Sequence, residues 1–257
     1  MSCKHFYFVR MAAALAFLGA AVFAVGQSRQ TTSQNGTNSD SSNVKSNARQ
    51  QPSPSPSAPR EENKEPADPT KYSYEFSQPS FTTSHIVIEH DANGKGKISF
   101  ERLNEAGPIE EPVELSPAAL GRILGLWRAL RFLDSTEDYQ SAKQFPHLGT
   151  MKLGMDDGKR KRSAEFNWTN NKQASDLVNE YRRVSDQAVL VFDIGVAREN
   201  QPLNAPKLME YFESLLTRSG LSDPTQLVPL LRELTNDEHL PLIARNHATR
   251  LLKKIEK

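Results

Sequence analysis

Apolar residues divide the chain into three parts with different patterns. Residues 11–26 are almost continuously apolar, residues 27–70 contain Val44 as their only branched aliphatic residue, and residues 71–257 carry apolar residues at regular intervals. A segment with so little to bury cannot offset the entropy of ordering its backbone. We therefore expect the folded part of the chain to begin near residue 71, after a disordered Ser/Asn/Pro-rich linker over residues 27–70.

Alternation of apolar and polar residues predicts two β-hairpins. Four strands are expected, at residues 83–91, 97–103, 148–155 and 160–168. Asn93-Gly94 lies between the first two strands and Asp157-Gly158 lies between the last two. Glycine in such pairs adopts the positive φ angle that tight hairpin turns require.

Apolar residues at helical spacing predict two helices in the same region. Ser116 and Pro117 supply an N-cap and a first-turn proline to a helix that runs to about Phe132. A longer helix begins near Lys172. Its apolar stripe comprises Leu177, Val178, Tyr181, Val184, Ala188, Val191 and Phe192. The order β-β-α-β-β-α predicts the α+β class, with an antiparallel sheet from two hairpins and helices on one face.

The remaining residues are expected to be helical throughout. The three predicted helices cover residues 206–218, 224–234 and 241–255. We accordingly expect an α+β domain at residues 71–200 and a helical annex at residues 201–257.

The N-terminal apolar stretch has the features of an export signal. Lys4 and Arg10 precede 16 apolar or small residues, and Ala24 and Gly26 form a small-x-small site. A helix of that length measures about 24 Å, which is short of a membrane span. Residues 1–26 are therefore predicted to be a cleaved signal peptide, giving a periplasmic or extracellular protein. The linker would then be a tether, or else an unselected low-complexity segment.

Composition excludes several kinds of chemistry. Cys3 is the only cysteine and lies inside the predicted signal peptide, so the mature chain would have no disulfide or thiol nucleophile. The full chain has a formal net charge of +1. Because nucleic-acid-binding domains usually carry a clear basic excess, we expect no nucleic-acid partner.

The sharpest charge cluster is a basic tetrad in the second hairpin. Its members are Lys159, Arg160, Lys161 and Arg162. Alternation places the two arginines on the face of Ala164 and the two lysines on the opposite face. The tetrad is a candidate contact for an anionic partner, such as a protein or an envelope component. Alternatively, it is a solvated hairpin tip neutralised by neighbouring aspartates.

Other candidate motifs favour structural roles, so no metal or cofactor is expected. Residues 91–102 resemble a calcium loop, but Lys95 and Arg102 stand where ligands belong, which favours a hairpin turn. His85 and His90 lie five apart in one strand and therefore face opposite sides. Adjacent carboxylates such as Glu110 and Glu111 are expected in a loop.

Two tryptophans and two glycines are expected to lie at packing surfaces of the fold. Trp127 and Trp168 are expected in the core, because both lie on predicted buried faces. Gly121 and Gly125 form a flat stripe on the first helix. We expect this stripe to pack against the sheet, with a partner-facing groove as the alternative.

The last two helices resemble a single HEAT-type repeat. Residues 227–237 match the first helix and its closing Asn-Asp, and Ile243-Ala244-Arg245 with Leu251-Leu252 match the second, although residues 238–242 form an insertion. One repeat cannot bury its apolar face alone. The resemblance therefore implies a helical cap on the α+β part, or a surface for a partner.

Residues 84–188 are similar in layout to emfourin, a bacterial inhibitor of thermolysin-type metallopeptidases. The shared features are a strand pair, a helix led by Leu115-Ser116-Pro117, a strand–Asp-Gly–strand with basic residues, and a closing helix. The resemblance implies inhibition through a loop inserted into a protease cleft, and it assigns no inhibitory residue by position.

These observations together predict an exported, non-enzymatic binding protein. A metallopeptidase inhibitor is one alternative. A hydrolase is another, in which two ionisable groups with shifted pKa values would have to converge in a cleft.

Overall fold

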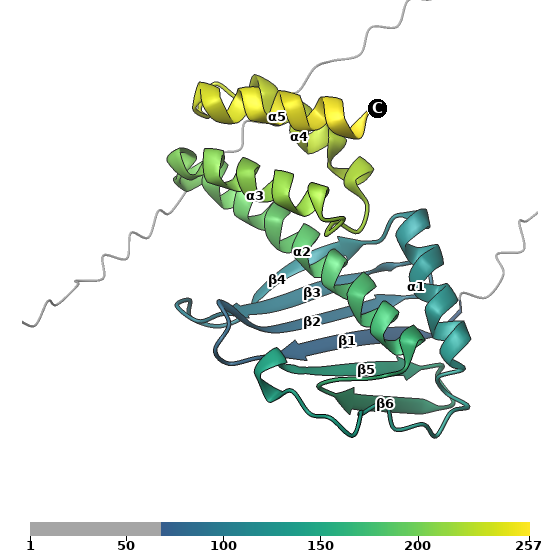
Figure 1. Cartoon of the computed structure of the whole chain (residues 1–257). Helices are drawn as coiled ribbons and strands as arrows, with labels where there is room; N and C mark the ends of the chain where they lie inside the picture. Colours follow the sequence, from purple (N-terminus) through teal and green to yellow (C-terminus); the bar gives the residue numbers. More distant parts are fainter. Residues whose placement is uncertain (1–67) are drawn as a thin grey trace, which may run out of the picture. The chain divides into compact units, whose positions relative to one another are not determined.

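The computed structural model describes residues 68–257 (Figure 1). The predicted signal peptide and the linker up to residue 67 lie outside the described residues. Within residues 68–257, no helix is long and apolar enough to cross a membrane.

The central feature is a six-stranded antiparallel sheet with strand order β4-β3-β2-β1-β5-β6. The strands are β1 (Lys71–Ser77), β2 (Thr83–Asp91), β3 (Lys95–Arg102), β4 (Ile109–Glu114), β5 (Thr150–Asp156) and β6 (Lys161–Phe166). Helices cover only one face of this sheet (Figure 1). The predicted α+β class, with two hairpins and helices on one face, is therefore confirmed.

Two of the six strands were not predicted. β1 pairs with β2 on one side and with β5 on the other, so it joins the two expected hairpins into one sheet. Its buried side chains, Tyr72, Tyr74 and Phe76, alternate with polar ones. β4 contains Glu110 and Glu111, and so the expectation that these carboxylates lie in a loop is wrong. Pro112 is tolerated there because β4 is an edge strand.

The helices begin close to where the sequence predicts. They are α1 (Pro117–Leu130), α2 (Lys172–Asn200), α3 (Ala205–Thr217), α4 (Val228–Asn236) and α5 (Leu242–Ile255), with short 3₁₀ segments at Pro146–Leu148, Pro202–Asn204 and Pro224–Leu227. Ser116 caps α1 by accepting a hydrogen bond from the Ala119 amide at 3.2 Å. Asn171 caps α2 in the same way, through the Ala174 amide at 3.0 Å.

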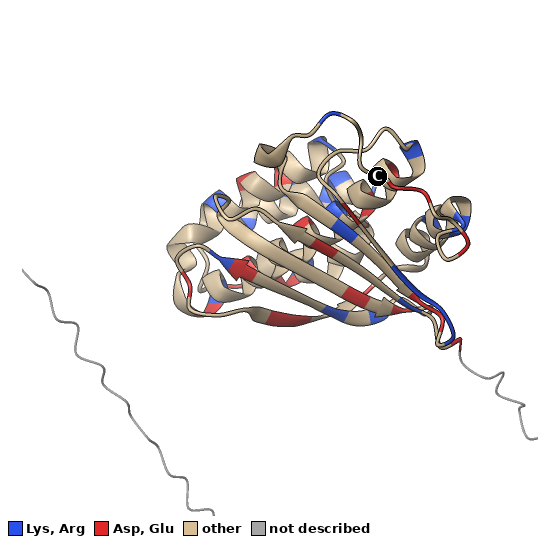
Figure 2. Ribbon diagram, turned by 90° about the horizontal axis from the view of Figure 1, so that it is seen from below, with Lys and Arg blue, Asp and Glu red and all other residues tan. Residues whose placement is uncertain are grey.

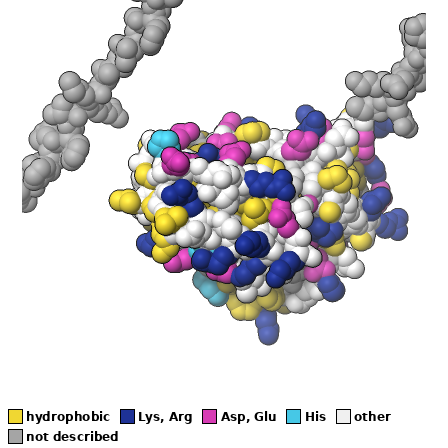
Figure 3. Space-filling view, turned by 90° about the horizontal axis from the view of Figure 1, so that it is seen from above, with side chains coloured by type: hydrophobic (Ala, Val, Ile, Leu, Met, Phe, Trp, Pro, Cys, Tyr) yellow, Lys and Arg dark blue, Asp and Glu magenta, His cyan; other side chains and the backbone are white. Residues whose placement is uncertain are grey.

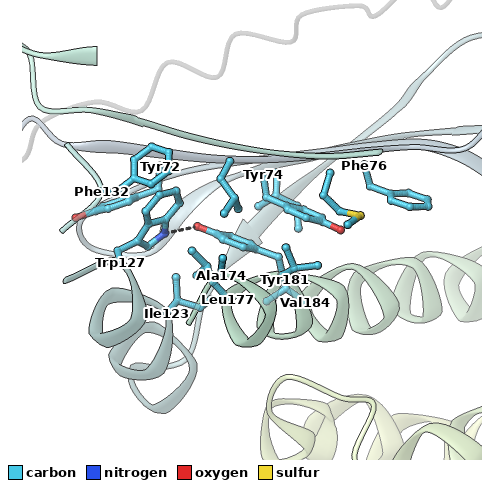
Figure 4. Packing of buried hydrophobic residues seen from close by; sticks show 14 of the residues in the cluster. Tyr72, Tyr74, Phe76, Ile123, Trp127, Phe132, Ala174, Leu177, Tyr181 and Val184 are labelled. Atoms are coloured by element: carbon cyan, nitrogen blue, oxygen red, sulfur yellow. Dashed lines mark hydrogen bonds between the residues drawn. The ribbon is translucent and has the colours of Figure 1, made fainter. Parts of the chain in front are cut away.

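The first core lies between the sheet and the pair α1 and α2 (Figure 4). At its α1 end, the Trp127 indole N–H donates to the Tyr181 hydroxyl at 3.0 Å, and that hydroxyl lies 2.9 Å from His90 Nε2. His90 Nδ1 lies 2.7 Å from the Asp91 carbonyl, which can only accept. The network therefore assigns the proton to Nδ1 and makes Nε2 the acceptor for the Tyr181 hydroxyl.

The other face of the sheet is uncovered and carries bands of charged residues (Figure 2). One row crosses all six strands with strictly alternating sign: Glu114, Lys95, Asp91, Lys71, Asp156 and Lys161. Opposite charges on facing strands attract, whereas like charges in the same register would repel. The three acidic and three basic side chains of this row therefore balance one another in charge.

The second core lies within the annex and includes the C-terminal half of α2. Leu190 and Ile194 of α2 pack with buried residues of α3, α4 and α5. Arg198 of α2 pairs with Glu233 at 2.9 Å and with Asp237 at 3.0 Å. The two cores thus share α2, and the second core begins ten residues before the predicted boundary at residue 200.

The outer helix of the annex is basic. α5 contains four Lys or Arg residues and no Asp or Glu. Viewed from this side of the molecule, basic side chains gather among acidic and apolar ones (Figure 3). His239 lies in the turn before α5 and His247 lies within α5.

Candidate functional site

A cleft of about 750 Å³ opens between the N-terminal half of α2 and the sheet. Its floor is formed by β1 and β5, and its walls by α2, the β1–β2 loop and the segment that follows β6. α1 lies over the opposite end of the same face (Figure 1). This space, the α2 cleft, therefore occupies the end of the helix-covered face that α1 does not reach.

Two exposed aromatic side chains line the α2 cleft. Phe81 is 43% exposed and Trp168 is 42% exposed. The Phe81 ring lies 6.0 Å from that of Phe76, and the Trp168 ring lies 5.2 Å from that of Phe145 in an edge-on arrangement. Large aromatic groups that stay exposed beside a concave apolar surface are typical of binding sites.

The loops that present these aromatics are tied to one another. The Gln78 amide donates to the Ser84 carbonyl at 2.8 Å, and the Phe81 amide donates to the Gln78 carbonyl at 3.0 Å. The Gln78 side chain donates to the Pro146 carbonyl at 3.0 Å, which connects the β1–β2 loop to the segment before β5. The rim is therefore held in shape by backbone and side-chain hydrogen bonds.

Three polar side chains approach the apolar lining. Tyr74 is fully buried in the floor, and its hydroxyl makes no hydrogen bond with the described residues. Arg182 reaches down from α2, so that Nη2 lies 3.7 Å from the Met151 sulfur. Asp186, one turn further along α2, lies 3.9 Å from Arg218.

Burial shifts the pKa of two of these groups upwards. It raises the pKa of Tyr74 to about 12, and the positive charge of Arg182 opposes this rise. Burial also raises the pKa of Asp186, against the charges of Arg218 and Arg182. The phenol is therefore neutral at pH 7, where it serves as a hydrogen-bond donor and not as a base.

The basic tetrad lies elsewhere and is divided between two surroundings. Arg160 pairs with Asp157 at 2.9 Å and with Asp134 at 2.6 Å. Arg162 donates to the carbonyls of Phe132 at 2.7 Å and Glu137 at 2.6 Å, with its guanidinium 4.5 Å from the Phe132 ring centroid. Both arginines thus have partners within the segment that follows α1.

The two lysines of the tetrad project into solvent. Lys159 is exposed, and the Lys161 side chain is 80% exposed with its ammonium 3.8 Å from Asp156. Of the tetrad, only these lysines keep exposed charges without a close bond, because the guanidinium groups already bind carboxylates or carbonyls.

Three expectations about packing have different outcomes. Trp127 is buried, as expected, whereas the expectation for Trp168 is wrong because this residue lies beyond the end of β6. The expectation that Gly121 and Gly125 pack against the sheet is also wrong. A Cβ added at either glycine would meet nothing within 4 Å, and both line a shallow groove that also includes Arg183.

Residues 91–102, which resemble a calcium loop in sequence, contain a hairpin turn, as expected. The Asp91 carboxylate accepts hydrogen bonds from the Asn93 and Lys95 amides at 2.9 Å. His85 and His90 lie on opposite faces of β2. Within residues 68–257, no three His, Cys, Asp or Glu side chains are grouped so that they could hold a metal ion.

Sequence reasoning missed the α2 cleft as a whole. Tyr74 is separated by more than a hundred residues from its other polar residues, Arg182 and Asp186, so no short motif contains all three. The apolar alternation of residues 72–76 and the long stripe of α2 are the signals from which the floor and wall could have been found. No protein-family model matches the chain, and no curated protein is significantly similar to it in sequence.

Proposed function

We propose that this chain is an exported, non-enzymatic binding protein that takes the apolar part of its ligand into the α2 cleft. The observation that carries the proposal is the pair of exposed aromatic residues, Phe81 and Trp168, beside a concave apolar surface of about 750 Å³. Small-molecule sites have volumes of this order and the same mixture of apolar lining and a few polar groups.

Export is supported by the N-terminal sequence alone. The positively charged start, the apolar stretch of 16 residues and the small-x-small site at Ala24 to Gly26 have the pattern of a secretory signal. Fractionation of a tagged chain, with its N-terminus determined after secretion, tests this part of the proposal. A mature chain that starts at Gln27 is the expected result, and retention in the cytoplasm would contradict it.

The binding proposal is tested with N-phenyl-1-naphthylamine, an uncharged dye that fluoresces in apolar sites. We expect the full chain to bind the dye, and we expect replacement of both Phe81 and Trp168 by Ser to weaken binding about tenfold or more. The matched control replaces Leu203 and Ile243, which are 84% and 65% exposed and do not line the α2 cleft. Equal loss of binding in both double variants would contradict the proposal.

A specific observation also favours the hydrolase as a second candidate. Asp186 and Tyr74 both line the α2 cleft and both have a raised pKa. Such a pair is the kind of arrangement that a hidden enzyme requires. The test is hydrolysis of p-nitrophenyl butyrate by the full chain and by the Asp186→Asn variant. Equal background rates for both proteins would exclude Asp186 as a catalytic group for this ester.

A further inference from the structure

We propose that the ligand of the α2 cleft is a small amphipathic monocarboxylate, whose carboxylate binds Arg182 and Tyr74 while its apolar body lies against the aromatic rim. This inference rests on the proposed function, because it names the ligand class of the same site. It is carried by two polar groups that lack strong partners, by the sum of the nearby charges and by the size of the cleft.

Arg182 is a solvent-exposed cation at the cleft wall, without a carboxylate partner among the described residues. No carboxylate of the described residues lies within 4 Å of its guanidinium, although its neighbour Arg183 pairs with Glu180 at 2.7 Å. The guanidinium instead faces the Met151 sulfur at 3.7 Å and the Phe76 ring centroid at 6.0 Å. A thioether is a weak acceptor, so several N–H donors of Arg182 remain available to an oxygen of a ligand.

Tyr74 supplies a second donor at the floor of the same cleft. Its side chain is 0% exposed and its hydroxyl donates no hydrogen bond to the described residues. Leaving a buried polar group unpaired costs about 1–3 kcal/mol. The hydroxyl lies close enough to Arg182 for the cation to lower the pKa of the phenol. One carboxylate could accept hydrogen bonds from both groups once a side chain above the Tyr74 hydroxyl shifts, because that hydroxyl has almost no exposed surface.

The local sum of charges favours an anion. Three charged groups meet at this wall: Arg182, Asp186 and Arg218. Asp186 lies 3.9 Å from Arg218, which offsets its charge and leaves Arg182 as the cation without a counterion within 4 Å. A carboxylate is matched to a guanidinium because two parallel N–H···O bonds can form between the two planar groups.

The apolar part of the ligand is defined by the remaining lining. Phe76, Phe81, Phe166 and Trp168 surround the space, and Val178 of α2 closes it. A volume of about 750 Å³ is of the order that a small molecule fills. These features favour an alkyl or aryl chain that bears one terminal carboxylate over a sugar, a nucleotide or a polyanion.

The experiment compares dodecanoate with 1-dodecanol, which has the same alkyl chain without a charge. Each is titrated against the full chain loaded with N-phenyl-1-naphthylamine, and displacement of the dye reports binding. We expect dodecanoate to bind about tenfold or more tightly than 1-dodecanol. Arg182→Gln should abolish this preference, and Tyr74→Phe should reduce it severalfold.

The matched control is Arg183→Gln, which removes the same charge from the next position of α2. Because Arg183 lines a different groove, this variant should keep the preference for dodecanoate. Equal affinities for the two ligands, or equal effects of Arg182→Gln and Arg183→Gln, would overturn the inference and leave the binding proposal intact. Failure of the wild-type chain to bind the dye or either ligand would instead overturn the binding proposal itself.

Discussion

A buried tyrosine hydroxyl lies at each end of the first core, and the two hydroxyl groups differ in their hydrogen bonding. Tyr74 and Tyr181 stack with ring centroids 5.1 Å apart and planes inclined by 1°. The Tyr181 hydroxyl points toward Trp127 and is hydrogen-bonded, whereas the Tyr74 hydroxyl points the other way and has no partner (Figure 4). The difference arises because α1 covers only the first of these ends.

The α1 end of the core therefore serves stability, whereas we infer that the open end serves ligand binding. At the α1 end, the chain of hydrogen bonds from Trp127 through Tyr181 and His90 to the Asp91 carbonyl satisfies every buried polar atom involved. At the open end, Arg182 and Tyr74 retain unused donors beside apolar surface. Buried polar groups in proteins are nearly always hydrogen-bonded. Donors without a partner at the open end therefore point to a site where a ligand binds.

The largest expected difference between the ends concerns the two tryptophans. Trp127 is 2% exposed, so Trp127→Ala should lower the free energy of unfolding by about 3–5 kcal/mol through lost packing and the loss of the indole donor to the Tyr181 hydroxyl oxygen. Trp168→Ala should lower it by less than about 1 kcal/mol, since that side chain is already 42% exposed. Urea unfolding followed by circular dichroism measures both values. Similar losses would show that the open end is as important to stability as the α1 end.

The next largest difference concerns the two stacked tyrosines. Tyr181→Phe removes a hydroxyl with two partners and leaves the indole N–H unpaired, which should cost about 1–3 kcal/mol. Tyr74→Phe removes a hydroxyl that has no partner, so the free energy of unfolding should stay the same or rise slightly. Urea unfolding of both variants under identical conditions tests the pair, and a costly Tyr74→Phe would mean that its hydroxyl is satisfied in solution.

The sequence predicted the helices and four of the strands, but not how the strands join into one sheet. Two hairpins, the N-cap at Ser116 and the start of α2 near Lys172 follow from local turn chemistry and periodicity. β1 was missed because its seven residues follow a low-complexity segment, and the loop that joins them to β2 has no glycine pair to signal a hairpin turn. Its pairing with β5, which is non-local, makes it a central strand of the sheet.

The α2 cleft was harder to predict than the sheet, because it is formed by residues that lie far apart in the sequence. The position of Trp168 shows why, since its alternation with Phe166 predicts burial, but β6 ends at Phe166 and the chain leaves the sheet. The short length of α1 relative to α2 then leaves an uncovered area of sheet. No local pattern reports how far one helix extends over a sheet, and therefore the α2 cleft could not be predicted from periodicity.

Acid should affect the α1 end through His90. Burial lowers the pKa of His90 in the folded state below the ordinary value of 6.5, and the neighbouring Asp91 opposes this shift. The unfolded state then binds a proton more readily, so the stability that depends on neutral His90 is complete above about pH 6.5 and declines as the pH falls below it. A protonated Nε2 could also no longer accept from the Tyr181 hydroxyl. We expect this part of the pH dependence to be absent in His90→Gln, as measured by urea unfolding between pH 5 and pH 8.

The open end should respond to pH in the opposite direction through Asp186. Its pKa is raised by burial, so the folded state binds this proton more tightly than the unfolded state. The associated stability is present below the ordinary value of 3.8 and is lost as the pH rises through the folded-state pKa. Asp186→Asn should therefore be more stable than the wild type at pH 7, and the two proteins should converge in acid. A less stable variant at pH 7 would show that attraction to Arg218 outweighs burial.

The smallest expected effect tests whether the outward stripe of α1 is used for contact. Gly121→Ala and Gly125→Ala each place a methyl group where no atom lies within 4 Å. Because glycine costs helix stability relative to alanine, each change should raise the free energy of unfolding by about 0.5–1 kcal/mol. Dye binding in the α2 cleft should not change, since neither glycine lines it. A gain in stability without loss of ligand binding would assign α1 to the structural end of the core, whereas reduced binding would show that the two ends are coupled.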